Sequence, residues 1–271
     1  MEDRNNIDPN DWLEINKKSW DIRSDMHIGS KFYNVDAFKK KKNSLHSIEL
    51  DLLGDVQGKS ILHLQCHFGL DSLSLEVLGA HVTALDFSAH AINYAEKLKK
   101  ELQLKTTFLC KNVYDLKPAD KNPYNIAFSS YGIVGWLPDL KKWAKVIHAQ
   151  LETNGRFILV DFHPTLWMFD DDFQAIEYSY FNDRPYIEID KGSYADVTNK
   201  KEVASIWWNH SLSEIMSAFL EEGFQLNAFK EFDYSPFNCF KQSMEIEKDK
   251  YRIKHLDQKL PMVYGMVFQK K

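Results

Sequence analysis

The strongest constraint on the fold of this chain lies in residues 60–88, SILHLQCHFGLDSLSLEVLGAHVTALDFS. An apolar run at 61–64 is followed by Gly69, and apolar residues then recur at helical spacing up to the next glycine. A second apolar run, 82–85, ends on Asp86. The pattern predicts a strand, a helix and a strand, which together form a βαβ unit of a parallel sheet.

The two ends of this unit favour a binding site. In an open parallel sheet the ligand lies beyond the carboxyl ends of the strands, where Gly69 and Asp86 both fall. Gly69 permits a close approach of ligand to backbone, and the Asp86 carboxylate suits the two hydroxyls of a ribose. Residues 65–68 lack the further glycines of GxGxxG, which let a pyrophosphate lie against the backbone. A ligand with a ribose but no phosphate therefore fits better.

The segment ILHLQCHFG, followed by ALDFS, resembles the first two motifs of class I S-adenosylmethionine-dependent methyltransferases, in the variant where HLQCHFG replaces DLGCGTG. The later segments NVYDL, AFSSYGIVGWLPDL and LETNGRFILVDFHP are similar in order and spacing to the family's third to fifth strands and their loops. The resemblance covers residues 58–163. His63 departs from the usual acidic residue, and Gln65 and His67 replace two glycines, which implies that the methionine end of the cofactor is held differently or more loosely.

The resemblance implies the fold of the whole chain. We expect a single α/β domain with a Rossmann-like, seven-stranded, mostly parallel sheet, helices on both faces and an antiparallel C-terminal hairpin. Its expected parts are an N-terminal helical lid (1–57), a cofactor-binding core (58–163), a substrate-cover insertion after strand five (164–210) and the C-terminal part of the sheet (211–271).

The resemblance also implies the activity, which is methyl transfer from S-adenosyl-L-methionine to a small-molecule acceptor by in-line displacement. The cofactor contacts that it implies are Gln65, Cys66, His67, Phe68, Gly69, Asp86, Phe87, Asn112, Val113, Ser130 and Tyr33. Asn112 and the Val113 amide would face the adenine edge, whereas the alternative for Asn112 is an Asx turn at the end of a strand. Tyr33 is a lid residue or packs on the sheet.

A general base is optional, because a sulfonium methyl group is already activated. His163 is the first choice, since it directly follows strand five, and His210 and Tyr131 come next. Alternation along the strand places Asp161 on the same side as His163, where it would orient the ring or raise its pKa. The competing interpretation is that His163 only terminates the strand before Pro164.

Other segments give weaker predictions. A helix opens at residues 8–10, and a second is expected over Asp36–Leu53. Ser211 and Glu214 predict a capping box. Ten of the 47 residues in 164–210 are aromatic, which predicts a water-excluding cover or a small satellite core. Residues 234–261 predict no element.

Composition excludes several classes. A net charge of −5 without a clustered basic face argues against nucleic acid. The three separated cysteines predict no disulfide, and no apolar run is long enough to span a membrane, so we expect a cytoplasmic protein. The oligomeric state stays open.

Two features keep other classes of function open. His63 and His67 match HxxxH, but that spacing converges on a metal only within a helix, so no metal is expected. The βαβ unit with Asp86 also fits a nicotinamide-dependent oxidoreductase, against which the missing GxGxxG counts. The lost glycines also fit a catalytically degenerate, cofactor-binding protein.

Overall fold

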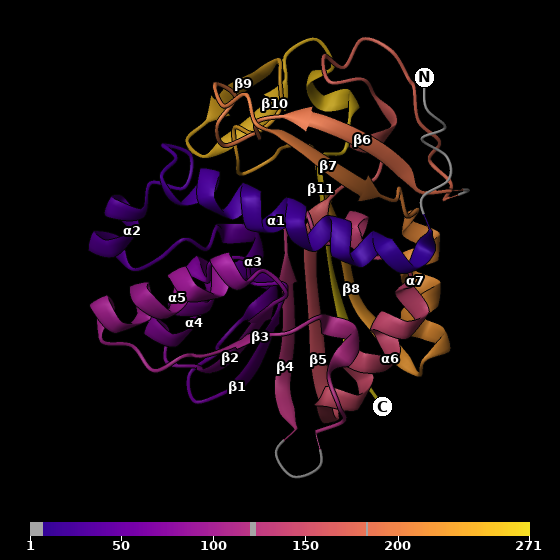
Figure 1. Ribbon diagram of the computed structural model, residues 1–271. Helices are drawn as coiled ribbons and strands as arrows, with labels where there is room; N and C mark the ends of the chain where they lie inside the picture. Colours follow the sequence, from indigo (N-terminus) through magenta and orange to yellow (C-terminus); the bar gives the residue numbers. More distant parts are fainter. Residues whose placement is uncertain (1–7, 120–122, 183) are drawn as a thin grey trace. The chain divides into compact units, whose positions relative to one another are not determined.

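The computed structural model describes residues 8–119, 123–182 and 184–271. Its α-helices are α1 (Trp12–Ile28), α2 (Val35–Lys41), α3 (Ser47–Leu53), α4 (Leu70–Val77), α5 (Ala89–Leu102), α6 (Leu140–Gln150) and α7 (Leu212–Glu221) (Figure 1). Its strands are β1 (Ser60–Leu64), β2 (His81–Asp86), β3 (Thr107–Cys110), β4 (Tyr124–Ser130), β5 (Leu151–Phe162), β6 (Tyr186–Lys191), β7 (Glu202–Trp207), β8 (Phe224–Phe232), β9 (Ser243–Glu247), β10 (Lys250–Ile253) and β11 (Val263–Lys270).

The described strands form one seven-stranded sheet in the order β3-β2-β1-β4-β5-β11-β8, and two separate hairpins. The β1–β2, β2–β3 and β4–β5 pairs are parallel, whereas β11 pairs antiparallel with both β5 and β8. The predicted fold class, with its antiparallel C-terminal strands, is confirmed. By contacts the chain divides into two compact units. The first comprises residues 8–44, 56–116 and 185–208, and the second comprises the described residues of 45–55, 117–184 and 209–271.

The first unit contains the predicted βαβ element. Strand β1 pairs in parallel with β2 from Ser60 opposite His81 to Leu64 opposite Leu85. Helix α5 begins after Ser88, whose hydroxyl accepts a hydrogen bond from the Ala91 amide at 3.2 Å. Ser88 is therefore the N-cap of α5, because its oxygen satisfies an amide that has no partner inside the helix.

Helix α1 lies along the hairpin of β6 and β7 in the same unit (Figure 1). The Asn16 carboxamide donates to the carbonyl of Ile206 at 2.7 Å and accepts from its amide at 2.9 Å. The Arg23 guanidinium bonds to the Asp190 carboxylate at 2.8 Å and to the Ser205 hydroxyl at 2.7 Å. These contacts hold the hairpin, which is part of the predicted insertion, against the N-terminal helix.

The predicted second helix over Asp36–Leu53 is wrong, because the structure divides it into α2 and α3. Lys42 ends α2 in a left-handed conformation with φ of 53°, and His46 opens α3 in an extended one. The side chain of Glu49 accepts from the His46 amide at 3.3 Å, which completes a capping box with a histidine as the N-cap.

The core of the second unit is built from large aromatic side chains. The rings of Phe157, Phe219 and Phe268 stack, with centroids 4.9 Å apart for the first pair and 4.6 Å for the second. Helix α3 packs on β11 at Gly265, where a Cβ atom would lie 2.4 Å from the Leu52 side chain. A side chain at this position would separate the helix from the strand.

Residues 234–261, for which the sequence predicted no element, contain the hairpin of β9 and β10.

None of the described helices is long and apolar enough to cross a membrane.

Candidate functional site

The loop after β1 keeps a backbone conformation that favours glycine. Gln65 and His67 both have φ of 52°, and Gly69 has φ of 83°. At Gly69 a Cβ atom would also lie 2.6 Å from the Phe108 ring. The two residues that replace glycines therefore adopt left-handed backbone angles, which cost about 1 to 2 kcal/mol for a residue with a side chain.

We expect the variant Gln65→Gly to raise the free energy of unfolding by about 1 kcal/mol, since glycine adopts φ of 52° without steric cost. Urea denaturation measures the change. Gln103→Gly is the matched control, because Gln103 also has a positive φ, 58°, but lies exposed at the end of α5. If the control gains stability and Gln65→Gly loses it, the Gln65 side chain stabilises the loop by other contacts.

Asp86 connects this loop to the end of β2. One carboxylate oxygen accepts from the His67 amide at 2.9 Å, and the other accepts from the Ser88 amide at 2.9 Å. Burial raises the pKa of Asp86 from its ordinary 3.8 to about 6, although these amides lower it. The carboxylate thus has a structural role that the sequence did not indicate. Each oxygen still has a second acceptor position for a ligand.

This pKa predicts a pH dependence of cofactor binding. The ionised Asp86 can accept from both ribose hydroxyls, whereas the protonated group has to donate its own hydrogen. Because the pKa is raised to about 6, affinity for S-adenosylhomocysteine should be constant above about pH 7 and fall by up to tenfold per unit below about pH 6. Calorimetric titrations of the wild-type protein between pH 5 and 8 measure the profile. The same affinity at pH 5 and pH 8 would contradict it, and Asp86→Asn should remove the dependence.

The end of β3 shows the Asx turn that was the alternative for Asn112. Its side-chain oxygen accepts from the Tyr114 amide at 3.0 Å and caps a short 3-10 helix, Val113–Asp115. Val113 is buried, and the carbonyl of Phe87 accepts from the Cys110 thiol at 3.7 Å. A contact of Asn112 with adenine stays a prediction.

Tyr33 lies beside the loop at 65–69, which is the position expected of a lid residue. Its ring centroid is 5.4 Å from that of His67 and 4.8 Å from that of Phe68. Its hydroxyl is 2.5 Å from the hydroxyl of Tyr194, which lies between β6 and β7. The N-terminal segment and the predicted insertion therefore both contribute aromatic side chains near the loop at 65–69.

In the second unit, both nitrogens of His163 are engaged. Nδ1 accepts from the Thr165 amide at 3.2 Å, and Nε2 lies 3.0 Å from the Glu231 carboxylate on β8. Burial lowers the pKa of His163 against the opposing effect of Glu231. The expectation that Asp161 orients the ring is wrong, because the Asp161 carboxylate accepts from four backbone amides, three of them in the Gly132–Val134 segment.

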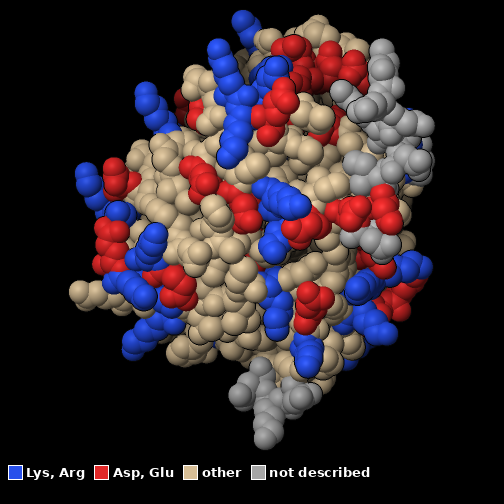
Figure 2. Space-filling model, in the orientation of Figure 1, with Lys and Arg blue, Asp and Glu red and all other residues tan. Residues whose placement is uncertain are grey.

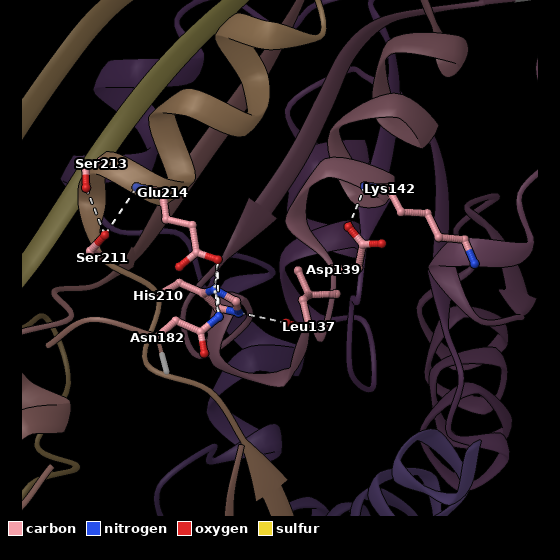
Figure 3. A network of polar contacts seen from close by, with 8 residues as sticks. All are labelled: Leu137, Asp139, Lys142, Asn182, His210, Ser211, Ser213 and Glu214. Carbon is pink, nitrogen blue, oxygen red and sulfur yellow. Dashed lines mark hydrogen bonds and ion pairs between the residues drawn. The ribbon is translucent and has the colours of Figure 1, made fainter. Parts of the chain in front are cut away.

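His210 belongs to a buried polar network (Figure 3). Its Nε2 donates to the carbonyl of Leu137 at 2.7 Å, and its Nδ1 lies 3.0 Å from the Glu214 carboxylate. The predicted capping box is therefore only half correct. Ser211 accepts from the Glu214 amide, whereas the Glu214 side chain binds His210 and Asn182.

We expect Glu214→Gln to lower the free energy of unfolding by about 1 to 2 kcal/mol at pH 7, because it removes the carboxylate that contacts the buried His210 ring. Burial raises the pKa of Glu214, but the hydrogen bond and charge of His210 outweigh it and lower the pKa. The contribution is therefore present above the ordinary pKa and lost as pH falls through the lowered one. Urea denaturation at pH 7 and pH 3.5 should show a larger difference at pH 7 than at pH 3.5. Glu221→Gln, which removes an exposed pair with Lys141, is the control. Equal losses in the two variants would contradict a special role of the network.

Tyr131 has a carboxylate partner that the sequence did not indicate. Its hydroxyl donates to Oε2 of Glu49 at 3.0 Å, and Glu49 is fully buried. The only sequence signal for Glu49 is its position three residues after His46, which was hidden by the wrong prediction of one continuous helix.

Half-buried aromatic side chains surround Tyr131 at the carboxyl ends of β4 and β5. The Tyr131 ring centroid is 4.8 Å from that of Phe237 and 5.5 Å from that of Phe162, which in turn is 5.1 Å from Phe240 and 6.0 Å from Trp167. We call these five residues the aromatic cluster. Ser130, the last residue of β4, directly precedes it and is half-buried.

Among the described residues, no group of three or more His, Cys, Asp or Glu side chains could hold a metal ion. His63 is buried, and its Nδ1 lies 2.8 Å from the Ser72 hydroxyl.

Comparison with known proteins adds the class. A family model described as a methyltransferase domain matches residues 61–155, and no curated protein matches the chain in sequence. An S-adenosylmethionine-dependent methyltransferase from Mesorhizobium loti is 16% identical, with a TM-score of 0.54, and covers 81% of this chain and 94% of its own. Another from Methanosarcina mazei is 18% identical, with a TM-score of 0.59. The match covers 84% of this chain and 99% of that protein.

A third similar structure is geranyl diphosphate C-methyltransferase from Streptomyces coelicolor, solved with Mg²⁺, geranyl diphosphate and S-adenosyl-L-homocysteine. It is 13% identical, has a TM-score of 0.55, and covers 88% of this chain and 79% of its own. At these identities the likeness is one of fold. The methyltransferase-domain match covers residues 61–155, and the seven-stranded sheet has the arrangement predicted from the resemblance to class I S-adenosylmethionine-dependent methyltransferases. These findings support S-adenosyl-L-methionine as the cofactor, as predicted.

Proposed function

We propose that the protein methylates a small-molecule acceptor with a planar, apolar body by in-line displacement. The observation that carries this proposal is the aromatic cluster, whose side chains are only half-buried. Within it, the Tyr131 hydroxyl contacts one buried carboxylate, that of Glu49. Aromatic rings bind flat apolar groups, and a few well-placed polar groups orient them. The similar geranyl diphosphate C-methyltransferase also acts on a small molecule with an apolar body.

For the cofactor we propose the residues that the resemblance implied. Asp86 would bind the ribose hydroxyls, the loop at 65–69 would contact the ribose and methionine end, and Asn112 and Val113 would face the adenine. The spare acceptor positions of Asp86 and the left-handed backbone at 65–69 support this arrangement. Phe87, Ser130 and Tyr33 complete the proposed set, with residues 1–57 as a lid and 164–210 as a cover.

S-adenosylmethionine supplies an activated methyl group, so the residues of this chain mainly orient the acceptor and exclude water, which can contribute about 7 to 11 kcal/mol. We propose Tyr131, rather than His163 or His210, as the group that removes a proton. The cofactor would supply the methyl group in exchange for the acceptor proton, and that proton would pass to the Tyr131 oxygen. The Tyr131 proton passes to Glu49, which later returns it to water. The histidines lack a free ring nitrogen for this step.

The face shown in Figure 2 does not favour a nucleic-acid acceptor. On the face shown in Figure 2, basic and acidic side chains are interspersed, and no continuous basic stripe is seen there.

The test is methylation with S-adenosylmethionine that carries a tritiated methyl group. A cell extract is separated into small-molecule, protein and nucleic-acid fractions, and each is incubated with the protein. We expect label in the small-molecule fraction, retained on a reversed-phase column. Label only in protein or nucleic acid would contradict the proposed acceptor class. Binding of S-adenosylhomocysteine without label in any fraction would favour the degenerate, cofactor-binding alternative.

A further inference from the structure

Two buried polar atoms in or beside the loop at 65–69 lack a hydrogen-bond partner among the described residues. They are the side-chain oxygen Oε1 of Gln65 and Nε2 of His27. A buried polar atom without a partner is destabilising by about 1 to 3 kcal/mol and requires an explanation. One common explanation is that a ligand provides the partner. His27 was not among the residues that the sequence indicated.

His27 reaches the loop through His67. It lies in the last turn of α1, is fully buried, and its Nδ1 is 3.3 Å from Nε2 of His67. The amide of His67 in turn donates to Asp86, the proposed ribose ligand. His27, the loop and Asp86 are thus connected within the first unit.

The rings of both histidines are neutral at pH 7. Burial and the nearby charge of Arg23 lower the pKa of His27 to about 3, and burial lowers the pKa of His67. A neutral imidazole has one N–H. When His67 donates to Nδ1 of His27, the hydrogen of His27 is on Nε2, which makes that atom a donor.

With His67 as the donor of that hydrogen bond, the two unpartnered atoms are one donor, on His27, and one acceptor, on Gln65. The methionine end of the cofactor carries an α-carboxylate, which accepts hydrogen bonds, and an α-ammonium group, which donates them. We propose that His27 donates to the α-carboxylate and that Gln65 accepts from the α-ammonium group. This inference rests on the proposed cofactor site. At position 65, where the family has a glycine, the proposed contact with the cofactor is made by the Gln65 side chain.

Two ligands that differ only at this end provide the test. S-adenosylhomocysteine carries the amino-acid end, whereas 5′-methylthioadenosine keeps the adenine, ribose and sulfur but lacks it. The variants are His27→Phe, which keeps the ring contacts to Tyr33 and Tyr194, and Gln65→Met, which keeps the length of the side chain. Isothermal titration calorimetry gives both affinities for each protein.

We expect each variant to bind S-adenosylhomocysteine about tenfold or more weakly, the effect of one hydrogen bond to a charged group. Its affinity for 5′-methylthioadenosine should stay within about twofold. Asp86→Asn is the control, because it should weaken both ligands by the same factor. Equal losses for both ligands in His27→Phe, or no loss for either, would overturn the inference. A wild-type protein that binds neither ligand would overturn the proposed site as well.

Discussion

The variant Tyr131→Phe should lower kcat by about 10² to 10⁴-fold with the acceptor identified by methyl labelling, the usual effect of removing a general base. The phenylalanine ring keeps the contacts with Phe162 and Phe237, so the aromatic cluster stays packed. What is lost is the hydroxyl that donates to Glu49. Steady-state kinetics measures kcat, and calorimetry should find the affinity for S-adenosylhomocysteine within about threefold of wild type.

Two further variants distinguish Tyr131 as the base from His163, the base that the sequence favoured. Glu49→Gln keeps a hydrogen bond to Tyr131 but removes the final proton acceptor, so it should also lower kcat. His163→Asn should leave kcat within about threefold, because both nitrogens of His163 are engaged by Thr165 and Glu231. A large loss of kcat in His163→Asn, with wild-type turnover in Tyr131→Phe, would reverse the assignment.

The variant Asp86→Ala should weaken binding of S-adenosylhomocysteine by tenfold or much more. It removes two hydrogen bonds to a charged acceptor, which contribute about 1.5 to 3 kcal/mol each. It also leaves the amides of His67 and Ser88 without their acceptor, so some loss of stability should accompany the loss of affinity. Asp86→Asn keeps one oxygen acceptor and the side-chain volume, and is the better variant for calorimetry.

Asp21→Asn is the matched control for Asp86. The Asp21 carboxylate accepts from the Ser88 hydroxyl at 2.6 Å, so it stabilises the same turn without belonging to the proposed site. Its variant should keep the affinity for S-adenosylhomocysteine within about twofold. If Asp21→Asn and Asp86→Asn weaken binding equally, the effect belongs to the turn and not to a ribose contact.

Much of the fold was predictable because its signals are local. The strand, helix and strand of residues 60–88 follow from apolar periodicity and two glycines, and the Ser88 cap follows from its position. The break between α2 and α3 was missed, because a lysine in a left-handed conformation at position 42 has no sequence signal. The hairpin of β9 and β10 was missed because its short strands alternate weakly.

The candidate site was predictable where motifs resemble the family, and less so where long-range contacts decide. Glu231 is 68 residues from His163, and His27 is 40 residues from His67. No local pattern indicates that such pairs meet. The buried position of Glu49 likewise depends on the packing of α3 and β11.

The most direct test of the account is a crystal structure of the protein soaked with S-adenosylhomocysteine. We expect the ribose hydroxyls within hydrogen-bond distance of the Asp86 carboxylate, with the methionine end over the loop at 65–69. A ligand bound away from Asp86, or no ligand at saturating concentration, would contradict the assignment of the cofactor site.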